Sequence, residues 1–181
     1  MGGDMTESSV GEIRVIHVDD EPDFAALAAD FLEREATQLC VETETSADAA
    51  LDRLATEHFD CVVSDYQMPG TDGLAFLETL REDRSSEIPF IIFTGKGREE
   101  VAIEALNLGA DRYLQKGGDP GAQFRVLAQA IDQEVEHHRT QRDLERRLIS
   151  TGTSSTSPAW ASSSSIRRPG SWWTPIPLHV S

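Results

Sequence analysis

The stretch IRVIHVDDEPDFAALAADFL, residues 13–32, decides the fold, because an apolar strand pattern passes through an acidic turn into an amphipathic helix. Residues 13–18 (IRVIHV) are rich in β-branched side chains, which predicts a strand. Apolar side chains then recur at helical spacing within residues 22–35, at Phe24, Leu27, Ala28, Phe31 and Leu32. A strand followed at once by a helix is the building unit of an α/β fold.

The same alternation of strand and helix patterns continues along the chain. Further strands are predicted at residues 39–44, 61–64, 88–93 and 112–114. Further helices are predicted at residues 47–56, from the turn at 68–70 to Leu80, at 98–108, and from about 120 toward 149. This alternation predicts a five-stranded parallel sheet that helices cover on both faces.

The composition is strongly acidic, with 32 Asp and Glu against 16 Lys and Arg in 181 residues, a net charge of −16. Such an excess repels phosphates and anionic lipids, so the main body is expected to bind neither nucleic acid nor a membrane. The start MGGDMTESSV lacks a signal-peptide pattern, and Cys40 and Cys61 are too few for a disulfide framework. These features predict a cytoplasmic protein, with acidity suited to a high-salt interior.

Polar side chains with complementary chemistry follow the predicted strands. Asp19 and Asp20 follow the first strand, Asp65 the third, Thr94 the fourth and Lys116 the fifth. Ligands of such sheets bind outside the carboxyl ends of the strands, so these groups are expected to meet there. Three carboxylates together favour a hard divalent cation such as Mg²⁺, and the ammonium and hydroxyl groups favour a phosphoryl group.

Each of these residues alone has an ordinary structural explanation. Asp20 stands where a helix N-cap is expected, Thr94 can belong to a turn, and Lys116 can be a solvated surface residue. Their joint occurrence at strand ends favours the functional interpretation.

Four ordered segments resemble the receiver domain of two-component response regulators, the CheY-like superfamily: VDDEP (18–22), VVSDYQMPGTDG (62–73), FIIFTGKG (90–97) and YLQK (113–116). The resemblance implies a doubly wound, flavodoxin-like sheet with strand order 2-1-3-4-5. It also leaves open whether the chain acts alone or is the N-terminal receiver of a larger regulator or hybrid sensor kinase.

The resemblance implies a role for each acidic residue at the site. Asp65 would accept a phosphoryl group from the phosphohistidine of a histidine kinase. Asp20 and Asp65 would bind Mg²⁺ directly, Asp19 would do so through water, and Gln67 would contribute its backbone carbonyl.

The resemblance also implies how phosphorylation is read out. Thr94 and Lys116 would bind phosphoryl oxygens, and Tyr113 would move inward together with Thr94 as the switch. Gly117 and Gly118 follow the lysine where family members commonly have proline, which predicts a looser loop. Gln67 and Lys96 occupy positions that tune dephosphorylation in the family.

Two other functions are weighed against a signalling receiver that is not an enzyme. A Mg²⁺-dependent phosphohydrolase with an aspartate nucleophile generally carries a second Asp two residues after the first, where this chain has Gln67. An unphosphorylated protein-interaction module would need an incomplete pocket, whereas the pocket predicted here is complete.

The chain divides into four predicted segments: a disordered start (1–11), the receiver (12–135), a helical extension (136–150) and a disordered tail rich in Ser, Thr, Pro and Trp (151–181). The tail has no acidic residue, which suggests a sequence out of register with the original reading frame. A short partner-binding tail that uses Trp172 and Trp173 is the competing interpretation. The downstream partner stays unknown, and homodimerisation stays open.

Overall fold

A computed structural model describes residues 11–95 and 99–150. Five strands form one parallel sheet in the order β2-β1-β3-β4-β5, which confirms the predicted topology. The strands are β1 (Ile13–Val18), β2 (Leu39–Glu44), β3 (Cys61–Ser64), β4 (Phe90–Thr94) and β5 (Arg112–Gln115). The predictions about residues 1–10, Lys96 and the tail 151–181 lie outside the described residues.

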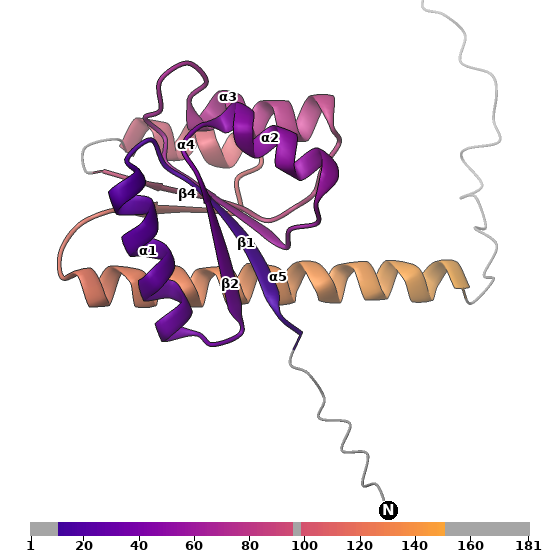
Figure 1. Ribbon diagram of the computed structural model, residues 1–181. Helices are drawn as coiled ribbons and strands as arrows, with labels where there is room; N and C mark the ends of the chain where they lie inside the picture. The colour runs from indigo at the N-terminus through magenta and orange to yellow at the C-terminus, as the bar shows by residue number, and fades with distance from the viewer. Residues whose placement is uncertain (1–10, 96–98, 151–181) are drawn as a thin grey trace, which may run out of the picture. The chain divides into compact units, whose positions relative to one another are not determined.

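Helices cover both faces of the sheet, with α1 and α5 on one face and α2, α3 and α4 on the other (Figure 1). They are α1 (Pro22–Glu35), α2 (Ala47–Thr56), α3 (Gly73–Glu78) with a following π-helical turn η1 (Thr79–Asp83), α4 (Glu99–Asn107) and α5 (Pro120–Ser150).

The fourth strand was predicted at residues 88–93, and it begins two residues later, at Phe90. Proline has no N–H to donate, so Pro89 contributes only its carbonyl, which accepts from the Val62 N–H at 2.8 Å. The Phe90 N–H donates to Asp111 Oδ2 at 2.8 Å, which ties the start of β4 to the start of β5.

Alternate strand residues supply two separate cores. In β1, Ile13 and Val15 pack beneath α1 and α5, whereas Ile16 and Val18 pack beneath α2, α3 and α4. Strands that are buried on both faces explain why the sequence shows continuous apolar runs rather than alternation.

The final helix packs against the sheet along the predicted stripe of Phe124, Leu127, Ile131 and Val135, all of which are buried. Of the described residues, those up to Asp143 belong to one compact unit, and residues 144–150 belong to a second. Within the described part of that second unit the helix continues to Ser150, and Leu148 is exposed.

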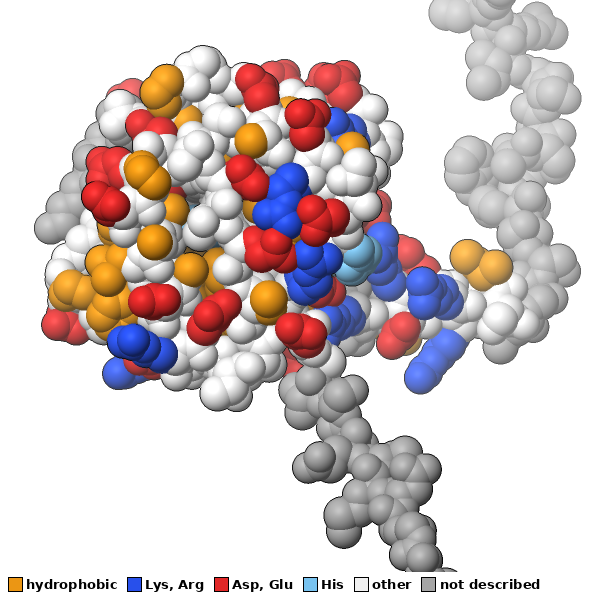
Figure 2. Space-filling model, in the orientation of Figure 1, with side chains coloured by type: hydrophobic (Ala, Val, Ile, Leu, Met, Phe, Trp, Pro, Cys, Tyr) orange, Lys and Arg blue, Asp and Glu red, His pale blue; other side chains and the backbone are white. Residues whose placement is uncertain are grey.

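Arginine and acidic side chains mix on the face seen in Figure 2. Arg53 pairs with Glu42, Glu44 and Glu57, and Arg14 pairs with Glu42 and Glu57. These pairs are half-exposed, so each contributes little stability, but together they contact both oxygens of the Glu57 carboxylate.

The buried His17 in β1 should make stability depend on pH. Neither ring nitrogen has a hydrogen-bond partner among the described residues, and burial lowers its pKa from 6.5 to about 4. The unfolded chain therefore binds a proton that the folded chain does not. The contribution of neutral His17 to the free energy of unfolding is complete above pH 6.5 and is lost as pH falls through 4. We expect unfolding in urea to cost about 2 kcal/mol less at pH 5 than at pH 7.

The variant His17→Val should lose most of that difference, since valine has no proton to bind. His58→Gln is the matched control because His58 is exposed, and it should keep the wild-type dependence. An unchanged difference in His17→Val would show that other groups cause it.

Candidate functional site

Backbone hydrogen bonds between neighbouring strands bring the predicted site residues together at the carboxyl edge of the sheet. The Asp65 N–H donates to the carbonyl of Val18, the residue before Asp19, at 2.8 Å. The Lys116 N–H donates to the Thr94 carbonyl at 2.6 Å. The parallel register of β1, β3, β4 and β5 therefore gathers residues that lie far apart in the sequence.

The three carboxylates form a compact cluster. Asp19, Asp20 and Asp65 each place one oxygen within 4.8 Å of the others. Asp19 and Asp65 are buried, whereas Asp20 is exposed. The N-cap of α1 is Glu21, not Asp20, so capping of this helix does not account for the Asp20 carboxylate.

Lys116 reaches into this cluster. Its Nζ lies 2.6 Å from Asp19 Oδ2 and 3.4 Å from Asp65 Oδ1. The same ammonium lies 4.4 Å from the centroid of the Phe24 ring, a cation–π contact. Sequence reasoning assigned Phe24 only to the helix face that packs on the core, and no local pattern marks its contact with Lys116.

The residues of the cluster fit Mg²⁺. Among the residues that the structure describes, one ammonium stands against three carboxylates, which leaves two negative charges without a nearby cation. Asp65 Oδ1 is buried and accepts no hydrogen bond from any residue that the structure describes, although Lys116 lies nearby. A buried acceptor without a donor is costly, and an all-oxygen, partly exposed set of ligands suits this hard cation.

A cavity of about 410 Å³ opens beside the cluster, lined by Asp20, Tyr66, Gln67, Met68, Pro69 and Asp72. Gln67 is exposed in the loop two residues after Asp65. Asp72 caps α3, since its Oδ1 accepts from the N–H groups of Leu74 at 3.0 Å and Ala75 at 2.9 Å. Sequence reasoning missed this cap, although an Asp before an apolar helix start is a recognisable signal.

The predicted switch residues occupy adjacent strands. Thr94 is buried at the end of β4, and Tyr113 in β5 is half-buried against the core beneath α2, α3 and α4. Thr94 pairs with Gln115 across the two strands, and Tyr113 comes two residues before Gln115 in β5.

The loop after Lys116 is held more firmly than the two glycines suggest. Gly117 and Gly118 have φ angles of 142° and 88°, in the range that favours glycine. The Gly117 N–H donates to Gln123 Oε1 at 2.8 Å, which anchors the loop to the first turn of α5. Sequence reasoning did not single out Gln123.

Magnesium should stabilise the folded chain through the cluster. At 100 times its dissociation constant, an ion that binds only the folded state adds about 2.7 kcal/mol. In Asp20→Asn we expect most of the Mg²⁺-dependent rise in Tm to disappear, because one of three carboxylate ligands is lost. Without Mg²⁺, the same variant should melt above the wild type, because carboxylate repulsion is reduced.

The control is Asp23→Asn, which removes an exposed carboxylate of α1 outside the cluster and should keep the full rise. Thermal melts of the three proteins with and without Mg²⁺ measure the effect. Equal rises in both variants would contradict a metal site at Asp20.

Residues 15–128 match the family profile described as response regulator receiver domain. The chain therefore belongs to the receiver domain family of response regulators, which function in two-component signalling. The transcriptional regulatory protein FixJ of Azorhizobium caulinodans is 34% identical over 124 residues, which cover 68% of this chain and 58% of that protein. ResD of Bacillus subtilis is 30% identical over 109 residues, 60% of this chain and 44% of that protein.

Solved structures agree with this assignment. A crystal structure of FixJ-N has 29% identity and a TM-score of 0.61, covering 69% of this chain and 94% of that chain. A CheY-like receiver from Methanospirillum hungatei has 26% identity and a TM-score of 0.59, covering 69% of this chain and 98% of that chain.

The chain spans only 58% of the length of FixJ and 44% of the length of ResD, so the match covers one part of each regulator. Among the described residues, no helix has both the length and the apolar character needed to cross a bilayer. The cytoplasmic location stays a prediction.

Proposed function

We propose that this chain receives a phosphoryl group from a histidine kinase on Asp65 and changes conformation in response. The observation that carries the proposal is the buried Asp65 Oδ1, which accepts no hydrogen bond among the described residues and lies 3.4 Å from Lys116 Nζ. Because no hydrogen bond engages this oxygen, the Asp65 carboxylate can coordinate Mg²⁺ through one oxygen and attack phosphorus through the other, while the adjacent ammonium neutralises charge on the arriving group.

Asp19, Asp20, Asp65 and the backbone carbonyl of Gln67 would hold Mg²⁺ at this site. When bound, the ion would neutralise negative charge that develops on the phosphoryl oxygens during transfer. The exposed Asp20 leaves this side of the cluster open to solvent, which suits an ion that keeps several waters.

The transfer needs little covalent chemistry from the protein. An Asp65 carboxylate oxygen forms a bond to phosphorus while the bond from phosphorus to the kinase imidazole nitrogen breaks, and that nitrogen keeps the electron pair. Lys116 and Thr94 would each bind a phosphoryl oxygen and so hold the group in position. The product is an acyl phosphate on Asp65, and catalysis is mostly positioning and electrostatics.

The switch would begin with Lys116. A phosphoryl group adds about −1.5 to −2 charges and competes with Asp19 for the ammonium, which now lies 2.6 Å from Asp19 Oδ2. Movement of Thr94 toward the new group would free space for Tyr113, and the surface around β5 would change for a downstream partner. Such a switch requires two states that are already close in energy.

We also propose that the chain does not turn over external substrates. A hydrolase needs a general acid or base near the acyl phosphate, and the side chain two residues after Asp65 is the amide of Gln67, which does not titrate. Under this proposal the chain catalyses only the phosphorylation and dephosphorylation of Asp65 itself.

The test is incubation with acetyl phosphate and Mg²⁺, followed by intact mass spectrometry and mapping of the modified peptide. We expect one labile phosphoryl group on the peptide that contains Asp65, and none when EDTA replaces Mg²⁺. A label on another residue would contradict the assignment. Repeated release of phosphate from unrelated phosphoesters would instead favour the phosphohydrolase.

A further inference from the structure

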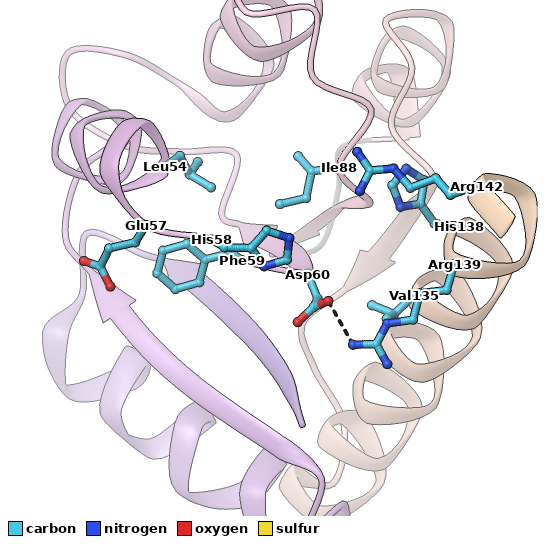
Figure 3. Close-up of a pocket in the computed structure, with 10 residues that line it drawn as sticks. All are labelled: Leu54, Glu57, His58, Phe59, Asp60, Ile88, Val135, His138, Arg139 and Arg142. Carbon is cyan, nitrogen blue, oxygen red and sulfur yellow. Dashed lines mark hydrogen bonds and ion pairs between the residues drawn. The ribbon is translucent and has the colours of Figure 1, made fainter. Parts of the chain in front are cut away.

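A second cavity, of about 210 Å³, lies at the other end of β3 from Asp65. Its walls come from the end of α2, the loop into β3, the loop before β4, and α5 (Figure 3). Nothing in the phosphorylation chemistry uses this cavity. Its side chains nevertheless combine apolar surface with several hydrogen-bond donors.

The acidic groups of the cavity are already engaged. Asp60 Oδ1 accepts from Arg139 Nη2 at 2.9 Å, and Asp60 Oδ2 accepts from the Arg14 N–H at 2.9 Å. Glu57 accepts from Arg53 and Arg14, and these hydrogen bonds lower its pKa to about 2. Both oxygens of each carboxylate therefore already accept a hydrogen bond.

The donors of the cavity are not all engaged. Arg142 has no ion-pair partner within residues 11–95 and 99–150, although the neighbouring Arg139 has one. His138 Nε2 is buried and lacks a hydrogen-bond partner within the same ranges. Both side chains extend from α5 toward Ile88 (Figure 3). Burial, and next the charge of the nearby Arg142, lower the pKa of His138, and they outweigh the opposing effect of the Asp111 and Glu87 carboxylates.

The rest of the wall is apolar, formed by Leu54, Phe59, Ile88 and Val135. The volume is below the roughly 300–1,000 Å³ of pockets that hold drug-sized ligands, so it fits a smaller molecule. A guanidinium binds a flat carboxylate through two parallel hydrogen bonds, and an apolar wall needs an apolar ligand surface.

We propose that this cavity binds a small organic carboxylate with a compact apolar body. Arg142 holds the carboxylate, His138 supplies a further hydrogen bond, and the apolar body packs on Leu54, Ile88 and Val135. The surface as a whole repels anions at a net charge of −16, so binding depends on this local group of donors. The site is independent of phosphorylation at Asp65.

The test is titration of the full chain with benzoate, followed by NMR of the histidine imidazole resonances. We expect saturable shifts of the His138 signals. Arg142→Gln should weaken benzoate binding about tenfold. The matched control is Arg146→Gln, which lies one turn later on α5 and does not line the cavity, and it should bind as the wild type does.

Two further probes separate charge from shape. Benzamide has the shape of benzoate without its charge, and inorganic phosphate has charge without an apolar body. Both should bind at least tenfold more weakly than benzoate. The proposal is overturned if either binds as tightly as benzoate, if the shifts do not saturate, or if Arg142→Gln and Arg146→Gln weaken binding equally.

Discussion

Asp65→Asn should abolish phosphorylation by acetyl phosphate, with no adduct left in the intact mass spectrum. The amide keeps the shape of the carboxylate but loses the charge and the nucleophilic oxygen. Because Asp65 is buried beside Asp19, the substitution also removes a repulsive charge, so the metal-free variant should melt above the wild type. Loss of the adduct therefore cannot come from loss of the fold.

Asp60→Asn is the matched control for this experiment. Asp60 precedes β3 and Asp65 follows it, so both flank the same strand. Asp60 pairs with Arg139 at 2.9 Å and contacts no residue of the carboxylate cluster. Its variant should become phosphorylated at the wild-type level, and an adduct that survives in Asp65→Asn would place the acceptor elsewhere.

Gly73→Ala should destabilise the protein by about 3 kcal/mol and reduce phosphorylation strongly, because α3 begins against the backbone of Asp65. A Cβ at Gly73 would lie 2.4 Å from the Asp65 carbonyl oxygen and 3.0 Å from Tyr66 Cα. Backbone atoms cannot rotate away as a flexible side chain can, so the loop that carries Asp65 must shift. Urea unfolding and the acetyl phosphate reaction measure the two effects.

Gly95→Ala supplies the comparison, since Gly95 lies at the same edge of the sheet and a Cβ there would meet nothing within 4 Å. We expect its stability to change by less than about 0.5 kcal/mol. Similar losses in both variants would mean that glycine flexibility, rather than close approach to Asp65, causes the effect.

Much of the fold follows from local patterns. The strands β1, β2 and β3 and the helices α1 and α2 have the predicted bounds, because apolar runs and helical spacing are unambiguous there. The helix after residues 68–70 was predicted to continue to Leu80, but it becomes π-helical at Thr79. In that turn Arg81 donates to the carbonyls of Ser86, Ile88 and Gly109, and such contacts between distant segments leave no local pattern.

The candidate site was predictable to a similar extent. Parallel strands must bring their carboxyl ends together, so Asp19, Asp65 and Lys116 could be grouped from the sequence alone. The contact of Phe24 with Lys116 and the anchor from Gln123 to Gly117 depend on how α1 and α5 lie on the sheet. The second cavity combines four segments, and no motif joins them.

The central position of β3 has a consequence for hydrogen exchange. This strand of four residues pairs with β1 on one side and β4 on the other, and all four of its residues are buried. Its amide protons should exchange only through global unfolding, more slowly than those of the edge strand β5. Asp65, the proposed acceptor, is therefore attached directly to the strand that we expect to open last, whereas Lys116 follows an edge strand that we expect to open earlier.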